Sequence, residues 1–421
     1  MSYVKRFIDK KIKNSLLAAS VVVIRGPKAC GKTETALQFA KSEVNLLYDI
    51  NARYLAQVAP SSVLEGDIPR LIDEWQETAN IWNSVKIESD KRKSAGQFIL
   101  TGSSTVDKSI NLHSEAGRFI VYDMSTMTWE ELGFSNSTVS LAGLLKNSKI
   151  TPKQNDTELK DILQRLAIGG WPILMGKTER QALDINRSYV DLLLSDDISR
   201  VSGVDRDRKR AMQLFMSLAR NIATPVEIST LASDGDSDTL GDVDTALSRQ
   251  TVYQYLNDMK RLMVVVEQPA WRPHIRSAAS LRTTPKRHIA DPSLAVAALG
   301  LSSDALLTDL KFTGLLFESQ VFHDIRAYAM ANDAEVSYYR DSYDNEVDII
   351  VENRVGEWAA FEVKLGDVDL DDAAEKLINF ANNIDIDKTR KPSSLNIIVG
   401  TGYTYTRPDG VNVVSLSTLG E

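Results

Sequence analysis

The sequence has few of the features that mark secreted or membrane proteins. It holds a single cysteine, Cys30, in 421 residues, which excludes an intramolecular disulfide framework or a zinc cluster built from cysteines and favours a reducing compartment. The first residues lack an apolar run of signal-peptide length, and no stretch approaches the roughly 20 apolar residues that a membrane span requires. We therefore expect a cytoplasmic protein with no membrane segment.

A large excess of positive charge is also lacking. The formal net charge of -8 gives no overall attraction to nucleic acid or to an anionic membrane, so contact with DNA would require a local basic surface. The composition, 43% hydrophobic and 25% charged, is typical of a globular protein. The length predicts two or three domains.

The clearest motif is a phosphate-binding loop of the pattern G-x-x-x-x-G-K-[ST]. A β-branched run at 21–24 predicts a buried parallel strand before the loop, and a helical pattern at 34–42 follows it, which is the context that the motif requires. Loop amides and the lysine would hold the phosphates of ATP, and the threonine would hold Mg²⁺. We expect ATP binding and hydrolysis here. The loop consists of Gly26, Pro27, Lys28, Ala29, Cys30, Gly31, Lys32 and Thr33.

Two acidic residues follow at the end of the short apolar run 69–74. Asp73 would hold Mg²⁺ through water, and Glu74 would polarise the water that attacks ATP. A solvated acidic pair at a helix start is the alternative. Pro69 and Arg70 make the run a poor central strand by local preference.

Two more residues are candidates for catalysis. Thr101 ends the predicted strand 97–100 and would sense the γ-phosphate or orient water, although a plain strand-to-loop turn explains it as well. Arg118 directly precedes the predicted strand 119–124. In ring-forming ATPases an arginine at this position reaches into the site of the neighbouring subunit, so Arg118 is a candidate arginine finger, with a surface arginine as the alternative.

Four strings then recur in a familiar order: PRLIDEWQ (Pro69–Gln76), GQFILTGSS (Gly96–Ser104), HSEAGRF (His113–Phe119) and GGWP (Gly169–Pro172). Together they resemble the prokaryotic AAA-type ATP-binding proteins that carry a C-terminal domain of unknown function (family 4143), over nearly the whole chain. The resemblance implies an AAA-like ATPase core, a winged-helix segment and a nuclease-like C-terminal fold.

The middle of the chain predicts a helical lid and then a winged helix-turn-helix. Helical patterns at 208–221, 226–233 and 248–261 precede a β-branched strand at 264–267, and Thr224-Pro225 would cap the second helix. The third helix would present Arg249, Gln250 and Gln254 to the edges of DNA bases. Protein packing or an oligomer contact is the alternative for this module.

Local charge argues in both directions about DNA. The insert Asp234–Asp244 is rich in aspartate and would repel phosphates, whereas a basic stretch follows the predicted wing. That stretch contains Arg272, His274, Arg276, Arg282, Lys286 and Arg287.

The C-terminal part carries a nuclease-like set of residues. Asp348 lies in one predicted strand, and Glu362 and Lys364 lie two residues apart in the next, on one face. Asp348 and Glu362 would share Mg²⁺, Lys364 would orient or deprotonate water, and Glu318 from a helix would complete the metal shell. A solvated face with alternating acid and lysine explains the same residues.

We therefore predict an α/β protein in four parts: a P-loop NTPase core with a parallel sheet (1–150), a helical lid (151–204), a winged helix-turn-helix (205–275) and a restriction-endonuclease-like α/β domain (276–421). The first hypothesis is an ATPase whose nucleotide state controls modules that bind double-stranded DNA. An ATP-gated nuclease is the second. The third is a protein whose homo-oligomeric state is switched by ATP.

Overall fold

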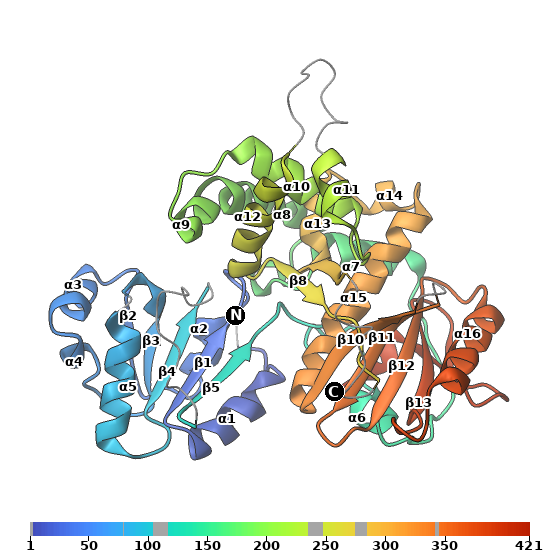
Figure 1. Ribbon diagram of the computed structural model, residues 1–421, viewed down its shortest axis with the longest axis horizontal. Coiled ribbons are helices and arrows are strands. Elements are labelled where there is room, and N and C mark those ends of the chain that lie inside the picture. Colours follow the sequence, from blue (N-terminus) through green and yellow to red (C-terminus); the bar gives the residue numbers. More distant parts are fainter. Residues whose placement is uncertain (1–2, 79, 104–116, 235–246, 274–283, 342–344) are drawn as a thin grey trace. The chain divides into compact units, whose positions relative to one another are not determined.

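The computed structural model describes residues 3–78, 80–103, 117–234, 247–273, 284–341 and 345–421 (Figure 1). The chain forms two compact units. Unit 1 comprises 1–126, 171–173 and 261–263, and unit 2 comprises 127–170, 174–260 and 264–421.

Unit 1 is built on a parallel sheet of five strands in the order β2-β3-β4-β1-β5. The run Val21–Ile24 is fully buried in β1, as expected for an apolar strand inside a parallel sheet. The α/β core expected from the sequence is therefore confirmed. The strands are β1 (Val21–Arg25), β2 (Ser42–Asn45), β3 (Arg70–Asp73), β4 (Phe98–Gly102) and β5 (Phe119–Asp123).

Helices complete unit 1, which forms the blue part of Figure 1. An aromatic core that includes Trp75, Trp82 and Phe98 joins the sheet to α3, α4 and α5, with the Trp75 and Trp82 ring centroids 4.7 Å apart. The helix after the phosphate loop ends at Leu37, earlier than predicted, because Ser42 already begins β2. The helices are α1 (Ile8–Ala18), α2 (Lys32–Leu37), α3 (Ile50–Val58), α4 (Pro60–Val63) and α5 (Asn80–Arg92), with a 3₁₀ turn at Trp75–Glu77.

The strand that carries Asp73 is an internal one. β3 lies between β2 and β4 and begins at Arg70. Pro69 therefore stands before the strand and removes no hydrogen bond from its ladder. The local preference against a central strand is overcome because Leu71, Ile72 and Asp73 are all buried in the sheet.

The helices of unit 2 follow the predicted order. The second helix of the predicted winged module begins at Ile228 with Glu227 at its N-cap, so the expected cap at Thr224 is wrong. Thr224 instead forms a β-bridge with Arg287. The helices between residues 159 and 306 are α7 (Leu159–Ile168), α8 (Glu179–Leu192), α9 (Ile198–Ser202), α10 (Arg208–Arg220), α11 (Ile228–Ser233), α12 (Arg249–Arg261), α13 (Pro292–Ala298) and α14 (Ser303–Leu306), with a π-helical turn at Leu193–Asp197. A 3₁₀ turn at Pro172–Leu174 begins in the short segment 171–173 of unit 1.

A two-stranded antiparallel ribbon follows α12. It consists of β8 (Val265–Gln268) and β9 (Lys286–Ile289), paired with Gln268 opposite Lys286. The ribbon leads into α13 and then into α15 (Leu310–Ala331). The sequence predicted only the first of its two strands.

A mixed sheet of seven strands forms the C-terminal part of unit 2, in the order β10-β11-β12-β13-β15-β14-β7. Figure 1 shows strands β10 to β13 between α15 and α16. α16 (Leu370–Asn383) is the crossover between the parallel strands β12 and β13, as parallel pairing requires. The strands are β10 (Ala334–Arg340), β11 (Glu346–Asn353), β12 (Trp358–Lys364), β13 (Ser394–Val399), β14 (Tyr403–Thr406), β15 (Asn412–Ser415) and β7 (Lys153–Gln154).

The boundary of the N-terminal unit differs from the predicted one. The first and longest stretch of unit 1 ends at Thr126 rather than at 150, because the segment that follows pairs with the C-terminal end of the chain. β6 (Val139–Ser140), which leads into α6 (Leu141–Leu144), pairs with β16 (Leu419–Gly420), which follows a 3₁₀ turn at Leu416–Thr418. β7 pairs with β14.

The first two residues of the GGWP string permit a close backbone approach in unit 2. A Cβ added to Gly170 would lie 2.1 Å from the carbonyl oxygen of Met127. The Met127 amide donates to the Gly170 carbonyl at 2.7 Å, and the Gly170 amide donates to the Asp291 carboxylate at 2.8 Å. Glycine is required at this position because its backbone is clamped on both sides.

We expect Gly170→Ala to lower the free energy of unfolding of unit 2 by about 2–3 kcal/mol, as overpacking against fixed backbone does. Gly314→Ala is the matched control, because Gly314 lies inside α15 with no atom within 4 Å of an added Cβ, and alanine is favoured in a helix by about 1 kcal/mol. Urea denaturation followed by circular dichroism measures both. Equal stability of the two variants would contradict the packing argument.

Candidate functional site

The phosphate loop connects β1 to α2 in unit 1. Gly31 has φ = 103°, a conformation that favours glycine, and a Cβ on Gly26 would lie 2.3 Å from the Met124 carbonyl oxygen. The Lys32 ammonium is buried and donates to the carbonyls of Gly26 (3.0 Å) and Pro27 (2.9 Å). The lysine thus holds the two ends of the loop together.

The remaining loop residues divide by exposure. Lys28 and Ala29 are exposed, and Ala29 has φ = 65°. Cys30 is buried, and its sulfur lies 3.7 Å from the Met124 carbonyl oxygen. Cys30 therefore acts as a small packing residue of the loop.

Asp73 is the centre of a hydrogen-bond network at the ends of the strands. Its carboxylate accepts from the Thr33 hydroxyl at 3.0 and 3.1 Å and from the Asn45 amide at 2.7 Å. It also accepts from the hydroxyl of Thr101, which is fully buried. This gives Thr101 a different place from the one predicted, since it orients Asp73. Ser104, at the end of the same string, lies outside the described residues.

Glu74 is held apart from Asp73 by an unusual backbone. Its φ of 53° turns the chain out of β3, and its carboxylate accepts hydrogen bonds from Gln76 and, at 3.4 Å, from Ser103. Ser103 belongs to the strand end whose hydroxyls were expected to sense the γ-phosphate or orient water, whereas Gln76 is a functional candidate that the sequence analysis missed. They hold the carboxylate that would polarise water.

Arg118 lies at the end of the sheet where the parallel strands begin, opposite the end that carries the phosphate loop. It immediately precedes β5, whose first residue, Phe119, pairs with Val21 at the start of β1, whereas the phosphate loop follows the end of β1. Five strand residues separate the two ends, about 16 Å at the usual rise per residue. In its own unit Arg118 pairs with Asp90 of α5 at 2.5 Å.

An arginine before α1 supports the phosphate loop, and no sequence pattern pointed to it. The buried Arg6 guanidinium donates to the carbonyl of Cys30 at 3.0 Å and to those of Ser125 (2.9 Å) and Thr126 (3.1 Å). The Arg6 amide donates to Asp9 at 3.0 Å. The N-terminal segment thus ties the phosphate loop to the main chain at 125–126.

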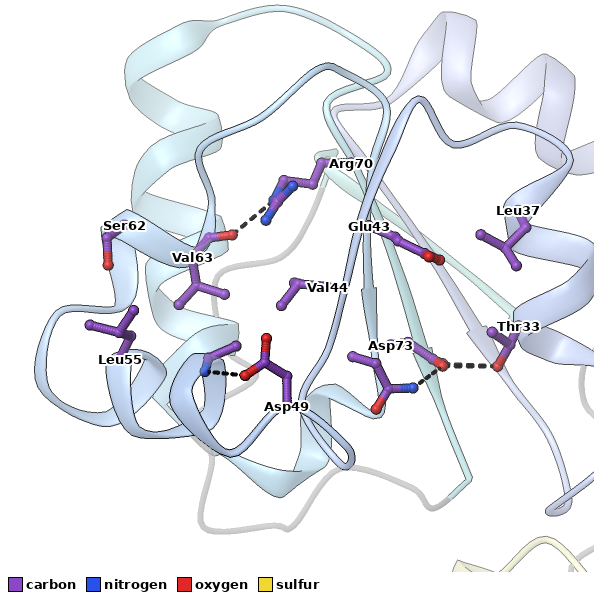
Figure 2. A pocket seen from close by; sticks show the side chains of 12 residues that line it. Thr33, Leu37, Glu43, Val44, Asp49, Leu55, Ser62, Val63, Arg70 and Asp73 are labelled. Carbon is purple, nitrogen blue, oxygen red and sulfur yellow. Dashed lines mark hydrogen bonds between the residues drawn. The ribbon is translucent and has the colours of Figure 1, made fainter.

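A pocket of about 600 Å³ opens beside the Thr33–Asp73 pair. Figure 2 shows Thr33 and Asp73 joined by their hydrogen bond at one end of the pocket and Arg70 near Val63. The Arg70 guanidinium donates to the Val63 carbonyl at 2.8 Å, and burial lowers its pKa. The pocket is lined by Thr33, Leu37, Glu43, Val44, Asn45, Asp49, Ala52, Leu55, Ser62, Val63, Arg70 and Asp73.

The residues present fit a nucleoside triphosphate with Mg²⁺. Gly26 lies where a Cβ would collide with the Met124 carbonyl oxygen, and Gly31 has a positive φ. The loop opens onto the N-terminus of α2, which favours anions. The Thr33 hydroxyl and the Asp73 carboxylate are hard oxygen ligands within hydrogen-bond distance of each other, as Mg²⁺ requires.

The exposed face of α12 in unit 2 is polar. Arg249, Gln250 and Gln254 are exposed, as predicted. The acidic residue of the helix, Asp258, is buried and pairs with Arg206 at 2.7 Å. Tyr253 adds an exposed aromatic ring to this face.

The predicted basic stretch is only partly a surface. Lys286 and Arg287 are buried in β9, because Lys286 pairs with carboxylates and Arg287 donates to the Val226 carbonyl. Arg272 is exposed. His274, Arg276 and Arg282 lie outside the described residues, as does the aspartate-rich insert beyond Asp234.

The predicted nuclease residues do come together in unit 2. Glu318 and Asp348 both contact one ammonium group, and Lys364 lies 3.6 Å from the Glu362 carboxylate. The Asp348 carboxylate accepts from the Val363 amide at 2.9 Å, which joins β11 to β12 beside Glu362.

Two lysines that the sequence analysis did not assign to the cluster also belong to it. The Lys286 ammonium lies 2.7 Å from Glu318, 2.6 Å from Glu346 and 3.3 Å from Asp348. Lys376 of α16 lies 2.7 Å from Glu362. Within the described part of the chain, no three acidic, histidine or cysteine side chains are placed to hold a metal ion. The cluster therefore does not fit the open metal site that the sequence predicted.

Burial sets the electrostatics of this cluster. It would lower the pKa of Lys286, but the nearby carboxylates, Glu318 first, raise that pKa above its usual value. Burial and the charge of Asp348 raise the pKa of Glu318 to about 8 and that of Glu362 to about 7. Lys286 is thus held in its charged form.

The fold and the site of unit 1 define a P-loop nucleotide-binding protein. The model of a family described as an AAA domain matches residues 18–133, one of a domain of unknown function (DUF8612) matches 159–305, and one of another (DUF4143) matches 313–419. The chain therefore carries an AAA domain in its N-terminal part and a DUF4143 domain in its C-terminal part, which confirms the resemblance expected from the four strings. The AAA domain indicates an ATPase as the class of protein.

Two curated relatives are similar along most of the chain. They are uncharacterized proteins of Mycobacterium bovis and Mycobacterium tuberculosis, each 23% identical over 369 residues, which are 86% of this chain and 74% of the relative. Among solved structures, the Aeropyrum pernix ORC1 protein in complex with DNA is 12% identical, covers 72% of this chain and 91% of its own, and has a TM-score of 0.23. Drosophila ORC bound to DNA is 13% identical, covers 69% and 84%, and has a TM-score of 0.21.

The described residues contain no helix that combines the length and the apolar character needed to span a membrane.

We expect Thr101→Val to lower the affinity of the site for Mg²⁺ by about 10- to 100-fold, as loss of a partner behind a metal ligand does. Nucleotide binding should then require a correspondingly higher Mg²⁺ concentration. Thr101→Ser keeps the hydroxyl and should behave as the wild type. Titration of a fluorescent ATP analogue at several Mg²⁺ concentrations measures the effect. A loss of ATP turnover with unchanged Mg²⁺ dependence would instead indicate the predicted γ-phosphate contact.

Proposed function

We propose that the protein hydrolyses ATP at the phosphate loop of unit 1, with Asp73 and Thr33 as the Mg²⁺-holding pair and Glu74 as the general base. The hydrogen bond between Thr33 and Asp73 carries this proposal, because it brings together the two groups that hold Mg²⁺ in P-loop enzymes. Glu74 lies one residue further and is oriented by Gln76.

The chemistry follows from the chain's own groups. Loop amides would bind the phosphate oxygens, and Lys32 would exchange its bonds to the loop carbonyls for bonds to the β- and γ-phosphates. Water attacks the γ-phosphorus, the bond to the bridging oxygen breaks, ADP leaves with the electron pair, and Glu74 takes the proton of the water. Mg²⁺ would neutralise charge on the phosphates.

Arg118 would act in this proposal only on the nucleotide of a second copy of the chain. Its position at the edge where the strands begin, and its ion pair with Asp90, keep it away from the phosphate loop of its own unit. An action of Arg118 on nucleotide therefore requires a second copy of the chain, as in a homo-oligomer.

We expect Lys32→Ala to abolish ATP binding and turnover, while Glu74→Gln keeps binding and lowers turnover at least about 100-fold, as loss of a general base does. Lys28→Ala is the matched control, because Lys28 belongs to the same loop and is exposed. Phosphate release and nucleotide binding by calorimetry measure the two steps. Normal turnover in Lys32→Ala would refute the site.

We further propose that α10, α11, α12 and the β8–β9 ribbon form a winged helix-turn-helix that binds double-stranded DNA through α12. The polar exposed face with Arg249, Gln250 and Gln254 supports this, since arginine and glutamine side chains pair with base edges in the major groove. The chain runs directly from α12 into 261–263, which belong to unit 1. This continuity offers a route by which nucleotide state would control the module.

Two alternatives remain as outcomes of the experiment. An ATP-gated nuclease would require an open metal site, and the ammonium of Lys286 among the carboxylates argues against one. A protein that only changes its oligomeric state with ATP would ignore DNA.

We expect double-stranded DNA to stimulate ATP turnover of the wild type, and Glu74→Gln to retain DNA in the presence of ATP. Arg249→Ala and Gln250→Ala should each weaken binding about 10-fold, the loss expected for one base contact. Arg187→Ala is the control, because Arg187 is an exposed arginine on α8. Fluorescence anisotropy and gel analysis of plasmid DNA measure binding and cleavage. ATP-driven oligomerisation with no response to DNA would contradict the proposal.

A further inference from the structure

The ammonium of Lys286 occupies the centre of the carboxylate cluster in unit 2. Its three acidic partners come from two different elements, with Glu318 on α15 and Glu346 and Asp348 on β11. The Lys286 side chain is only 1% exposed. Three oxygens therefore surround one positively charged point inside the protein.

We propose that this cluster is a latent divalent-cation site that the chain itself fills with the ammonium of Lys286. Hard divalent cations bind carboxylate oxygens at about 2.0–2.6 Å. The three oxygens lie 2.6, 2.7 and 3.3 Å from the ammonium nitrogen, so around Lys286 they are not yet placed to hold a metal ion. Rotation of the acidic side chains toward that point would complete the site once the ammonium is removed.

Glu362 offers a further carboxylate oxygen beside the cluster. It is 3% exposed, and its Oε2 atom accepts no hydrogen bond within the described part of the chain. It lies on β12 one step beyond the pair Ile349–Phe361, opposite Asp348. A buried carboxylate oxygen without a donor is unfavourable, and a cation bound beside Asp348 would satisfy it.

Lys286 is held in place by the ribbon that carries it. Opposite it, the Gln268 amide donates to the carbonyls of Ser337 (2.9 Å) and Asp348 (2.8 Å). Two residues further, His288 bonds to Ser319 at 3.1 Å and its ring stacks on that of Phe322, with centroids 3.9 Å apart. The ammonium is therefore a fixed component of the cluster.

A pocket opens beside the cluster, and its mostly acidic lining favours a positively charged ligand. It has a volume of about 350 Å³, and Glu346 and Lys376 line it while also contacting the cluster. Its other charged lining residues, Asp341, Asp372 and Glu375, are all acidic. Such a lining attracts a cation, so a divalent ion could reach the cluster once the ammonium is removed.

Replacement of the ammonium tests the site directly. Lys286→Met removes the charge and keeps the bulk, and Lys286→Arg keeps the charge. With Mn²⁺ as the probe, followed by the electron paramagnetic resonance of free Mn²⁺ without nucleotide, we expect Lys286→Met to bind one more ion per chain than the wild type, because removal of the ammonium leaves buried carboxylates without their cation. Lys286→Arg should bind no extra ion, and Asp348→Asn in the Lys286→Met chain should remove it.

A folded Lys286→Met that gains no Mn²⁺ overturns the proposal. A second comparison requires no substitution at Lys286. The wild type and Asp348→Asn should bind the same number of Mn²⁺ ions, and a site present in the wild type and lost in Asp348→Asn overturns the proposal as well. ATP turnover should be unchanged in Lys286→Met, so the result is independent of the ATPase assignment.

Discussion

One carboxylate, that of Asp73, joins the parts of the nucleotide site. Thr33 reaches it from α2, Asn45 from β2 and Thr101 from β4. The convergence is a property of the sheet, because parallel strands end at one edge and ligands bind outside their carboxyl ends. All three donors are neutral, so they satisfy the buried oxygens without neutralising the carboxylate, and within the described residues no lysine or arginine pairs with Asp73. That uncompensated charge is what a magnesium–nucleotide complex requires.

In unit 2 the charge of the clustered carboxylates is neutralised instead. Their donors include the ammonium groups of Lys286 and Lys376, which neutralise the charge that would otherwise attract a metal ion. A buried ion pair contributes little to stability in itself, but removal of one partner is costly. Buried carboxylates therefore keep a negative charge that can bind a cation in unit 1, whereas in unit 2 neighbouring lysines neutralise them. The identity of the donor decides the chemistry.

The sequence predicted those features whose causes are local. The phosphate loop, its flanking strand and helix, the position of Asp73 and Glu74 and the pairing of Glu362 with Lys364 all follow from short-range pattern. Asn45 was missed because β2 is short and half-buried, so no periodicity marks its last residue. Arg6 was missed because its partners are main-chain carbonyls more than 20 residues away. Every residue carries such a carbonyl, so no residue type in the sequence marks the partner.

Lys286 shows why the acid-x-lysine pattern underdetermines a nuclease-like domain. The pattern specifies which acids face one another across β11 and β12, but the occupant of the space between them comes from β9, 62 residues before Asp348. Local reading placed Lys286 on a basic surface, since a lysine beside an arginine is usually solvated. Burial reverses that interpretation: a lysine that is 1% exposed must neutralise acids. Its partners then cease to be free metal ligands.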